Sequence, residues 1–87
     1  MITYLFYTKQ SSGERQMADL ADRLARRAVK TQLVDADSLD GLRLVELYDL
    51  MIRPSVIVVR DDGNLVQSWA DQEQLPTVEE ISYFSHL

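Results

Sequence analysis

The 87-residue chain contains no cysteine and a single histidine, His86. Without cysteine, disulfide bonds, thiolate catalysis and cysteine-ligated metal sites are excluded. One histidine is too few for a histidine-based metal cluster, so we expect no metal and no other cofactor. Most redox and zinc chemistry is therefore excluded before any motif is considered.

Long hydrophobic runs are also missing. No stretch approaches the roughly 20 apolar residues that span a bilayer. The first residues, MITYLFYT, lack the basic start and long apolar run of a signal peptide. We therefore expect a cytoplasmic protein without a membrane partner. We also expect one domain, residues 1–87, whose core needs nearly all of the apolar side chains.

The formal net charge of −5 is unevenly distributed. Residues 1–30 hold six basic and three acidic side chains, whereas residues 31–87 hold three basic and eleven acidic ones. Contacts to nucleic-acid phosphates need clustered Lys and Arg side chains. We therefore expect no nucleic acid partner for this acidic chain.

The first half of the chain predicts alternating strands and helices. Residues 2–7, ITYLFY, are mostly β-branched or aromatic with little polar interruption, as in a central strand buried on both faces. Ser11 and Glu14 form a capping-box pattern. Apolar residues from Met17 onward, including Ala25 and Ala28, then follow helical spacing and predict a helix to residue 28 or 29.

The charged face of this first helix mixes both signs. Acidic and basic side chains recur four residues apart, a spacing that favours ion pairs on a helix surface. We expect these pairs largely to neutralise the face, which would then be an ordinary solvated surface. The pairs are Arg15–Asp19, Asp19–Arg23 and Asp22–Arg26.

The remaining chain continues the alternation. A short strand, 31–34, is followed by turn and capping residues at 35–38 and a helix over 39–50. The strands 55–60 and 65–69 flank the hairpin turn DDGN. Thr77 and Glu80 form a second capping box at the start of a last helix.

The order β-α-β-α-β-β-α predicts an α/β fold with a four-stranded mixed sheet and helices on both faces. Strands separated by helices are expected to pair in parallel through right-handed crossovers. The two strands joined by the Asp-Gly turn are expected to be antiparallel.

These patterns together resemble the thioredoxin-like superfamily, which includes the glutaredoxins, over essentially the whole chain. The resemblance rests on FYTK at the end of the first strand, the helix that follows it, VDAD after the second strand, and the segment YDLMIRPSVIVVRDDGNLV. In the active family a Cys-x-x-Cys or Cys-x-x-Ser motif begins the first helix. Here the corresponding residues are Ser12-Gly13-Glu14-Arg15. The resemblance therefore implies a redox-inactive thioredoxin-like domain, and we expect no enzymatic activity.

The resemblance also implies a ligand site. It suggests that Pro54 is a cis-proline, with the backbone of Arg53 exposed near the start of the first helix, where family members bind extended peptides or glutathione. A glutathione-like γ-glutamyl peptide would then contact Lys9, Ser12, Arg53 and Pro54. The alternative is that Pro54 only shapes the entrance to a strand and that Ser11 only caps the helix.

The helix over 39–50 is apolar around almost its whole circumference. A helix on one face of a sheet needs only a third to a half of its surface apolar, so several leucines should remain exposed. We predict a protein-interaction surface of Leu44, Leu47 and Met51, with Trp69 as a possible anchor. Alternatively, the chain end over 83–87 covers Leu44 and Leu47, or they are singly exposed leucines, and Trp69 is part of the core.

The leading hypothesis is therefore an interaction module or adaptor that binds a protein partner or a second copy of itself through the helix over 39–50 and the cis-proline loop at Pro54. The alternative is a domain that binds a glutathione-like ligand. A third possibility is a component of a larger assembly, whose acidic second half contacts a basic partner in a salt-sensitive way.

Overall fold

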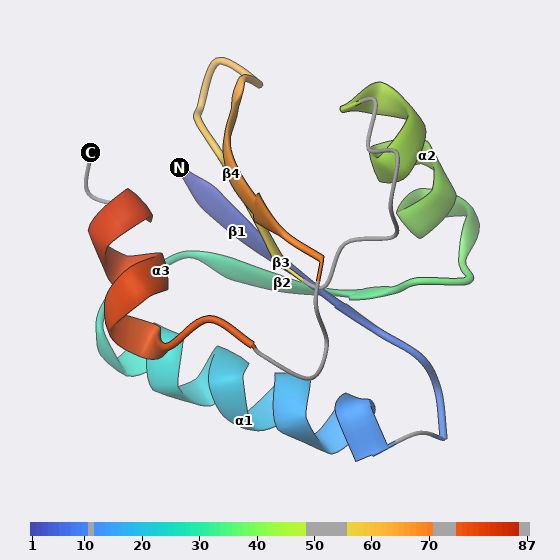
Figure 1. Ribbon diagram of the computed structural model, residues 1–87, viewed down its shortest axis with the longest axis horizontal. Coiled ribbons are helices and arrows are strands. Elements are labelled where there is room, and N and C mark those ends of the chain that lie inside the picture. The colour runs from blue at the N-terminus through green and yellow to red at the C-terminus, as the bar shows by residue number, and fades with distance from the viewer. Residues whose placement is uncertain (11, 49–55, 71–74, 86–87) are drawn as a thin grey trace.

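The computed structural model describes residues 1–10, 12–48, 56–70 and 75–85. The predicted order of strands and helices is confirmed (Figure 1). The first and last strands have the predicted bounds, and other boundaries shift by a few residues. The elements are β1 (Ile2–Tyr7), α1 (Ser12–Arg26), β2 (Thr31–Asp35), α2 (Leu39–Leu47), β3 (Val56–Val59), β4 (Leu65–Trp69) and α3 (Val78–Ser85).

The four strands form one mixed sheet in the order β2-β1-β3-β4. β1 is parallel to β2, β3 is antiparallel to β1, and β4 is antiparallel to β3. The expectation of parallel pairing across a helix is therefore confirmed for β2 but wrong for β3. β3 begins opposite Leu5, near the end of the sheet where β1 and β2 finish. The chain thus re-enters the sheet at the end from which it left, and β3 must run back.

The sheet separates two apolar cores, and Figure 1 shows α1 and α3 on one side of it and α2 on the other. On the first face, Leu24 and Ile81 are fully buried in one cluster with Leu5. On the second face, Leu44 and Tyr48 pack against a cluster that contains Phe6. Successive β1 side chains point to opposite faces, so the central strand supplies both cores. The prediction of helices on both faces is confirmed.

Helix α1 ends at Arg26 in a Schellman motif. The amide of Val29 donates to the carbonyl of Leu24 at 3.0 Å, and the amide of Ala28 donates to the carbonyl of Ala25 at 3.1 Å. Ala28 has a φ of 59°, in the left-handed region. The prediction that the apolar face includes Ala25 and Ala28 is wrong, since both are exposed. The left-handed turn ends the helix and buries Val29 against the first core instead.

Helix α2 begins with Ser38 as its N-cap, whose hydroxyl oxygen accepts a hydrogen bond from the Gly41 amide at 3.1 Å. Gly41 is buried against the end of β2. A Cβ atom here would lie 3.2 Å from the Ala36 carbonyl oxygen and closer still to that of Asp35. The close approach therefore requires glycine. The helix ends at Leu47, earlier than the predicted residue 50.

The two remaining turn predictions are confirmed. In the β3–β4 hairpin, the amide of Gly63 donates to the carbonyl of Arg60 at 2.9 Å, and Gly63 has a φ of 90°. Before α3, the amide of Glu80 donates to Thr77 Oγ1 at 3.1 Å. The amide of Thr77 donates in return to Glu80 Oε1 at 3.2 Å. These reciprocal bonds are the predicted capping box.

Candidate functional site

Helix α2 exposes three leucines on the side that faces away from the sheet. The side chains of Leu39, Leu42 and Leu47 are 64%, 51% and 69% exposed. At 100° per residue, Arg43 and Glu46 lie among them on the same side. We call these five residues the α2 leucine surface. The prediction that this helix leaves several leucines exposed is confirmed.

The sequence identified only part of this surface. Leu47 lies on it as expected, but Leu44 is half-buried and packs against the second core. Met51 lies outside the described residues. The predicted surface does not include Leu39 and Leu42, although the helical projection places them opposite Leu44. Knowing which side of the helix meets the sheet would have identified them.

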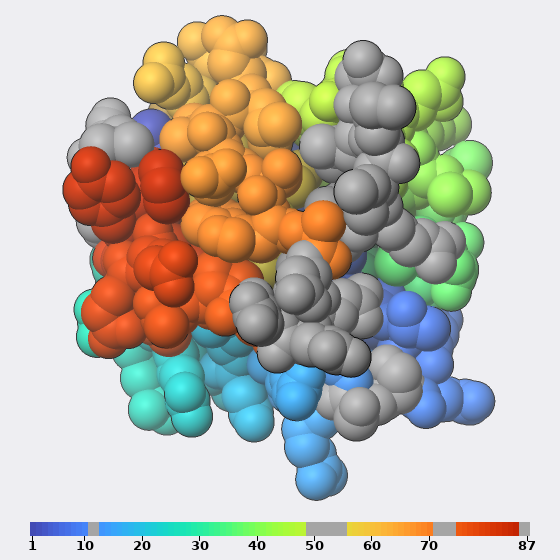
Figure 2. All heavy atoms as spheres, viewed as in Figure 1, coloured from blue at the N-terminus to red at the C-terminus, as the bar shows by residue number. Residues whose placement is uncertain are grey.

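Trp69 lies on the other face of the sheet. Its ring packs edge-on against Phe84, with ring centroids 5.6 Å apart and planes at 71°. Figure 2 shows β4 and α3 directly against each other on this face. Trp69 contributes to the first core, as the alternative interpretation of this residue predicted. The structure does not bring it together with the α2 leucine surface. Because α3 covers this face, the described chain end does not cover Leu44 or Leu47.

The structure describes only part of the predicted ligand site, namely Lys9 and the start of α1 at Ser12. Lys9 follows β1, and its Nζ atom lies 3.6 Å from Asp35 Oδ2 at the end of β2. Ser12 is the first residue of α1. Arg53 and Pro54 lie outside the described residues, and so does the proposed cis peptide bond.

Of the two residues in the predicted capping box of α1, the structure describes Glu14. Glu14 Oε2 accepts a hydrogen bond from the amide of Gln10 at 2.9 Å, one residue before the expected serine. Gln10 has a φ of 62°, so the turn between β1 and α1 is left-handed at this point. Ser11 lies outside the described residues. The glutamate therefore satisfies a backbone amide that precedes the helix.

The expected ion pairs on α1 do not form. Within the described part of the chain, the ion pairs within 4 Å join the N-terminal amine to Asp61, Lys9 to Asp35, and Arg27 to Glu79. Exposed pairs gain little from holding two long side chains in one geometry, so helical spacing alone does not secure them. Arg27 instead connects α1 to α3, with Nη2 3.0 Å from Glu79 Oε1. The basic face of α1 is therefore less neutralised than expected.

In the part of the chain that the structure describes, two ionisable groups have shifted pKa values. Partial burial at the end of α2, and then the neighbouring Tyr4, raise the pKa of the Tyr48 phenol. A hydrogen bond from the N-terminal ammonium group and its charge lower the pKa of Asp61. The first group belongs to the second core and the second to the hairpin, so neither forms a catalytic pair.

Among the described residues, no three His, Asp or Glu side chains come together as a metal site. No helix in that part of the chain is long and apolar enough to cross a membrane. Comparisons with protein-family models, curated proteins and solved structures find no match to this chain. The likeness to the thioredoxin-like fold therefore rests on topology, a β-α-β-α-β-β-α order with a mixed four-stranded sheet. Without cysteine, such a scaffold performs no thiol–disulfide exchange.

Proposed function

We propose that this protein is a redox-inactive thioredoxin-like domain that binds another protein through the α2 leucine surface. The observation that carries the proposal is the exposure of three leucines on one side of a nine-residue helix. Full burial of one leucine side chain contributes about 1.5–3 kcal/mol. A partner that covers Leu39, Leu42 and Leu47 would gain several such contributions at a single contact.

The charges of the surface support protein contact. Arg43 and Glu46 give the α2 leucine surface no net charge, although the whole chain carries −5. An acidic partner, including a second copy of this chain, would therefore meet Arg43 as well as Glu46 among the leucines. The exposed Asp40 lies at the edge of the surface, beside Leu47. In an antiparallel pair of α2 helices, the single positive and negative charges of one copy would face the opposite charges of the other.

Sedimentation velocity over a wide range of protein concentrations, together with co-purification from the native cell, tests the proposal. We expect concentration-dependent dimerisation or a specific partner, and we expect Leu42→Glu and Leu47→Glu each to abolish the association. Tyr83→Glu is the matched control, because Tyr83 is 64% exposed but lies on α3, on the other side of the sheet. A strict monomer without a partner, or an association that both α2 variants retain, would overturn the proposal.

A glutathione-like ligand at the start of α1 is the alternative proposal. It is supported by the side chain of Lys9, which is 71% exposed, and by the position of Ser12 at the start of α1, shortly after Lys9 in the chain. Titration with glutathione, followed by NMR, should then shift the amides of residues 12–15. The absence of any shift at millimolar glutathione would exclude this ligand.

A further inference from the structure

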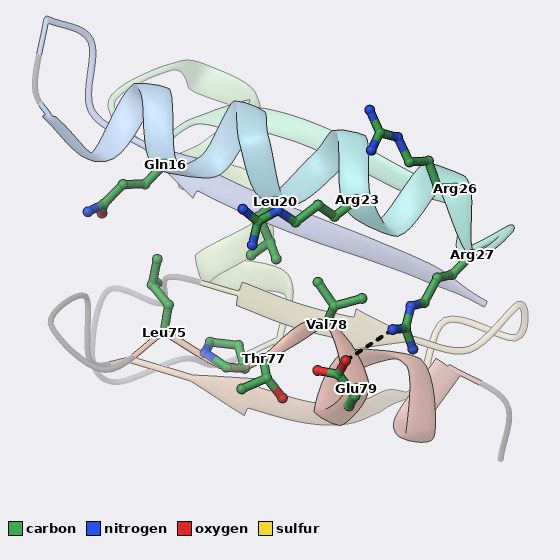
Figure 3. Close-up of a pocket in the computed structure, with 10 residues that line it drawn as sticks. Gln16, Leu20, Arg23, Arg26, Arg27, Leu75, Thr77, Val78 and Glu79 are labelled. Atoms are coloured by element: carbon green, nitrogen blue, oxygen red, sulfur yellow. Dashed lines mark hydrogen bonds and ion pairs between the residues drawn. The ribbon is translucent and has the colours of Figure 1, made fainter.

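A cleft lies between α1 and the segment that leads from Leu75 into α3 (Figure 3). Its volume is about 560 Å³, within the range of about 300–1,000 Å³ that is usual for small-molecule sites. Figure 3 shows Gln16 and Leu75 at one end and the Arg27–Glu79 ion pair at the other. The ion pair closes that end, so a ligand would occupy the middle of the cleft.

The floor of the cleft is apolar. Leu20 and Pro76 are buried, and Leu75 and Val78 are half-buried. In Figure 3, Leu20 and Val78 point toward each other from α1 and α3 across the middle of the cleft. The apolar part of a ligand would replace water on these side chains, which favours binding in proportion to the area covered.

The edge of the cleft is basic. Among the described residues, its lining contains Arg23, Arg26 and Arg27 but a single acidic residue, Glu79. Arg27 already donates to Glu79, and Figure 3 shows Arg26 pointing away from the cleft. The side chain of Arg23 runs along the cleft beside Leu20. No acidic side chain of the described residues lies within 4 Å of its guanidinium group. Of the described side chains that line the cleft, Arg23 is therefore the cation that remains available to a ligand.

We propose that this cleft binds a small organic anion with an apolar body. The Arg23 guanidinium group would hold the carboxylate or phosphate of the ligand through charge-assisted hydrogen bonds, and the apolar body would lie on Leu20, Leu75 and Val78. Both features are needed, because an exposed arginine alone binds simple anions weakly in salt. The site is independent of the α2 leucine surface, which lies on the other side of the sheet.

NMR titration of the full chain with octanoate and with octyl phosphate tests this site. Acetate and inorganic phosphate lack the apolar body, and octyl glucoside lacks the charge. We expect saturable amide shifts within residues 16–27 and 75–79 for at least one of the two amphiphilic anions, and much weaker effects from the three simpler compounds. Binding of octanoate alone assigns a carboxylate ligand, and binding of octyl phosphate alone assigns a phosphate ester.

Two variants, each with a control variant, identify the residues responsible for binding. Arg23→Ala should weaken binding about tenfold or more, the loss expected for a hydrogen bond to a charged group. Arg15→Ala is the matched control, because Arg15 is exposed on the same helix but does not line the cleft. Leu75→Ser should also weaken binding, while Leu42→Glu on α2 should not. The proposal is overturned if neither amphiphilic anion binds, if octyl glucoside binds equally well, or if Arg15→Ala weakens binding as much as Arg23→Ala.

Discussion

Ala28 holds a left-handed conformation at the position where helices usually place glycine. For an L-residue with a Cβ atom this conformation costs about 1–2 kcal/mol. Replacement by glycine removes the cost but adds about 0.4–1 kcal/mol of backbone entropy to the unfolded chain. We expect Ala28→Gly to raise the free energy of unfolding by about 0.5–1 kcal/mol, measured by urea denaturation. Ala18→Gly, at an exposed position in the interior of α1, should instead lower it by about 1 kcal/mol, and equal effects would contradict the Schellman ending.

Gly41 presents the opposite case, because here a single methyl group has no room. The Cβ atom of an alanine would contact the carbonyl oxygens of Asp35 and Ala36, which are backbone atoms that cannot rotate away. We expect Gly41→Ala to lower the free energy of unfolding by about 1–3 kcal/mol, although alanine is normally the better helix former. Arg43→Ala on the outward side of α2 should have little effect. A neutral Gly41→Ala variant would show that α2 can move away from β2.

At the scale of elements, Thr3 connects the first strand to the last helix. Thr3 is fully buried, its hydroxyl lies 3.4 Å from that of Ser85, and Ser85 donates to the Ile81 carbonyl at 2.8 Å. Ser85→Ala removes the partner of the Thr3 hydroxyl. We expect a loss of about 1 kcal/mol in the free energy of unfolding, the usual size for such a bond.

Thr3→Val in the Ser85→Ala background completes the comparison. The double variant should recover most of the lost stability, since it contains no unpaired hydroxyl. Thermal denaturation of the wild type, the two single variants and the double variant measures the coupling energy between the two hydroxyl groups. Strictly additive effects of the two substitutions would show that the two hydroxyls do not interact.

The elements also show how far sequence reasoning extends. β1 was predicted correctly because a run of mostly β-branched and aromatic residues, ended by the polar Thr8 and Lys9, is itself the signal of a buried strand. The end of α1 was placed too late, because Ala28 fits a helical pattern and gives no local sign of a left-handed turn. The direction of β3 was wrong, because the order of elements does not reveal at which end of the sheet the chain re-enters.

Of the two candidate sites, one could be predicted from the sequence and the other could not. The exposed leucines of α2 follow from an apolar surface larger than one sheet face can cover. The cleft between α1 and α3 does not follow, since Arg23 and Leu75 are distant in the chain. Only the packing of α3 beside α1 brings them to one place. A local pattern cannot contain that information.

At the scale of the whole molecule, stability should fall at alkaline pH. The folded chain holds the Tyr48 pKa above its ordinary value, so the neutral phenol is favoured in the folded state. The resulting contribution of Tyr48 to the free energy of unfolding is fully present below a pH of about 10, the pKa of tyrosine in the unfolded chain. It is lost as the pH rises through the pKa of Tyr48 in the folded chain. We expect Tyr48→Phe to reduce the alkaline loss of stability in urea denaturation at several pH values. Tyr83→Phe, at an exposed tyrosine, should retain it, and identical pH profiles for all three proteins would contradict the prediction.

The contact between Thr3 and Ser85 has a consequence for protein synthesis. The two residues are 82 positions apart, so β1 leaves the ribosome long before the helix that covers it. Until residues 78–85 emerge, the face of the sheet that carries Leu5 lacks Ile81. The growing chain therefore exposes part of its first core until residues 78–85 have been made, and the domain completes folding only once α3 is free of the exit tunnel.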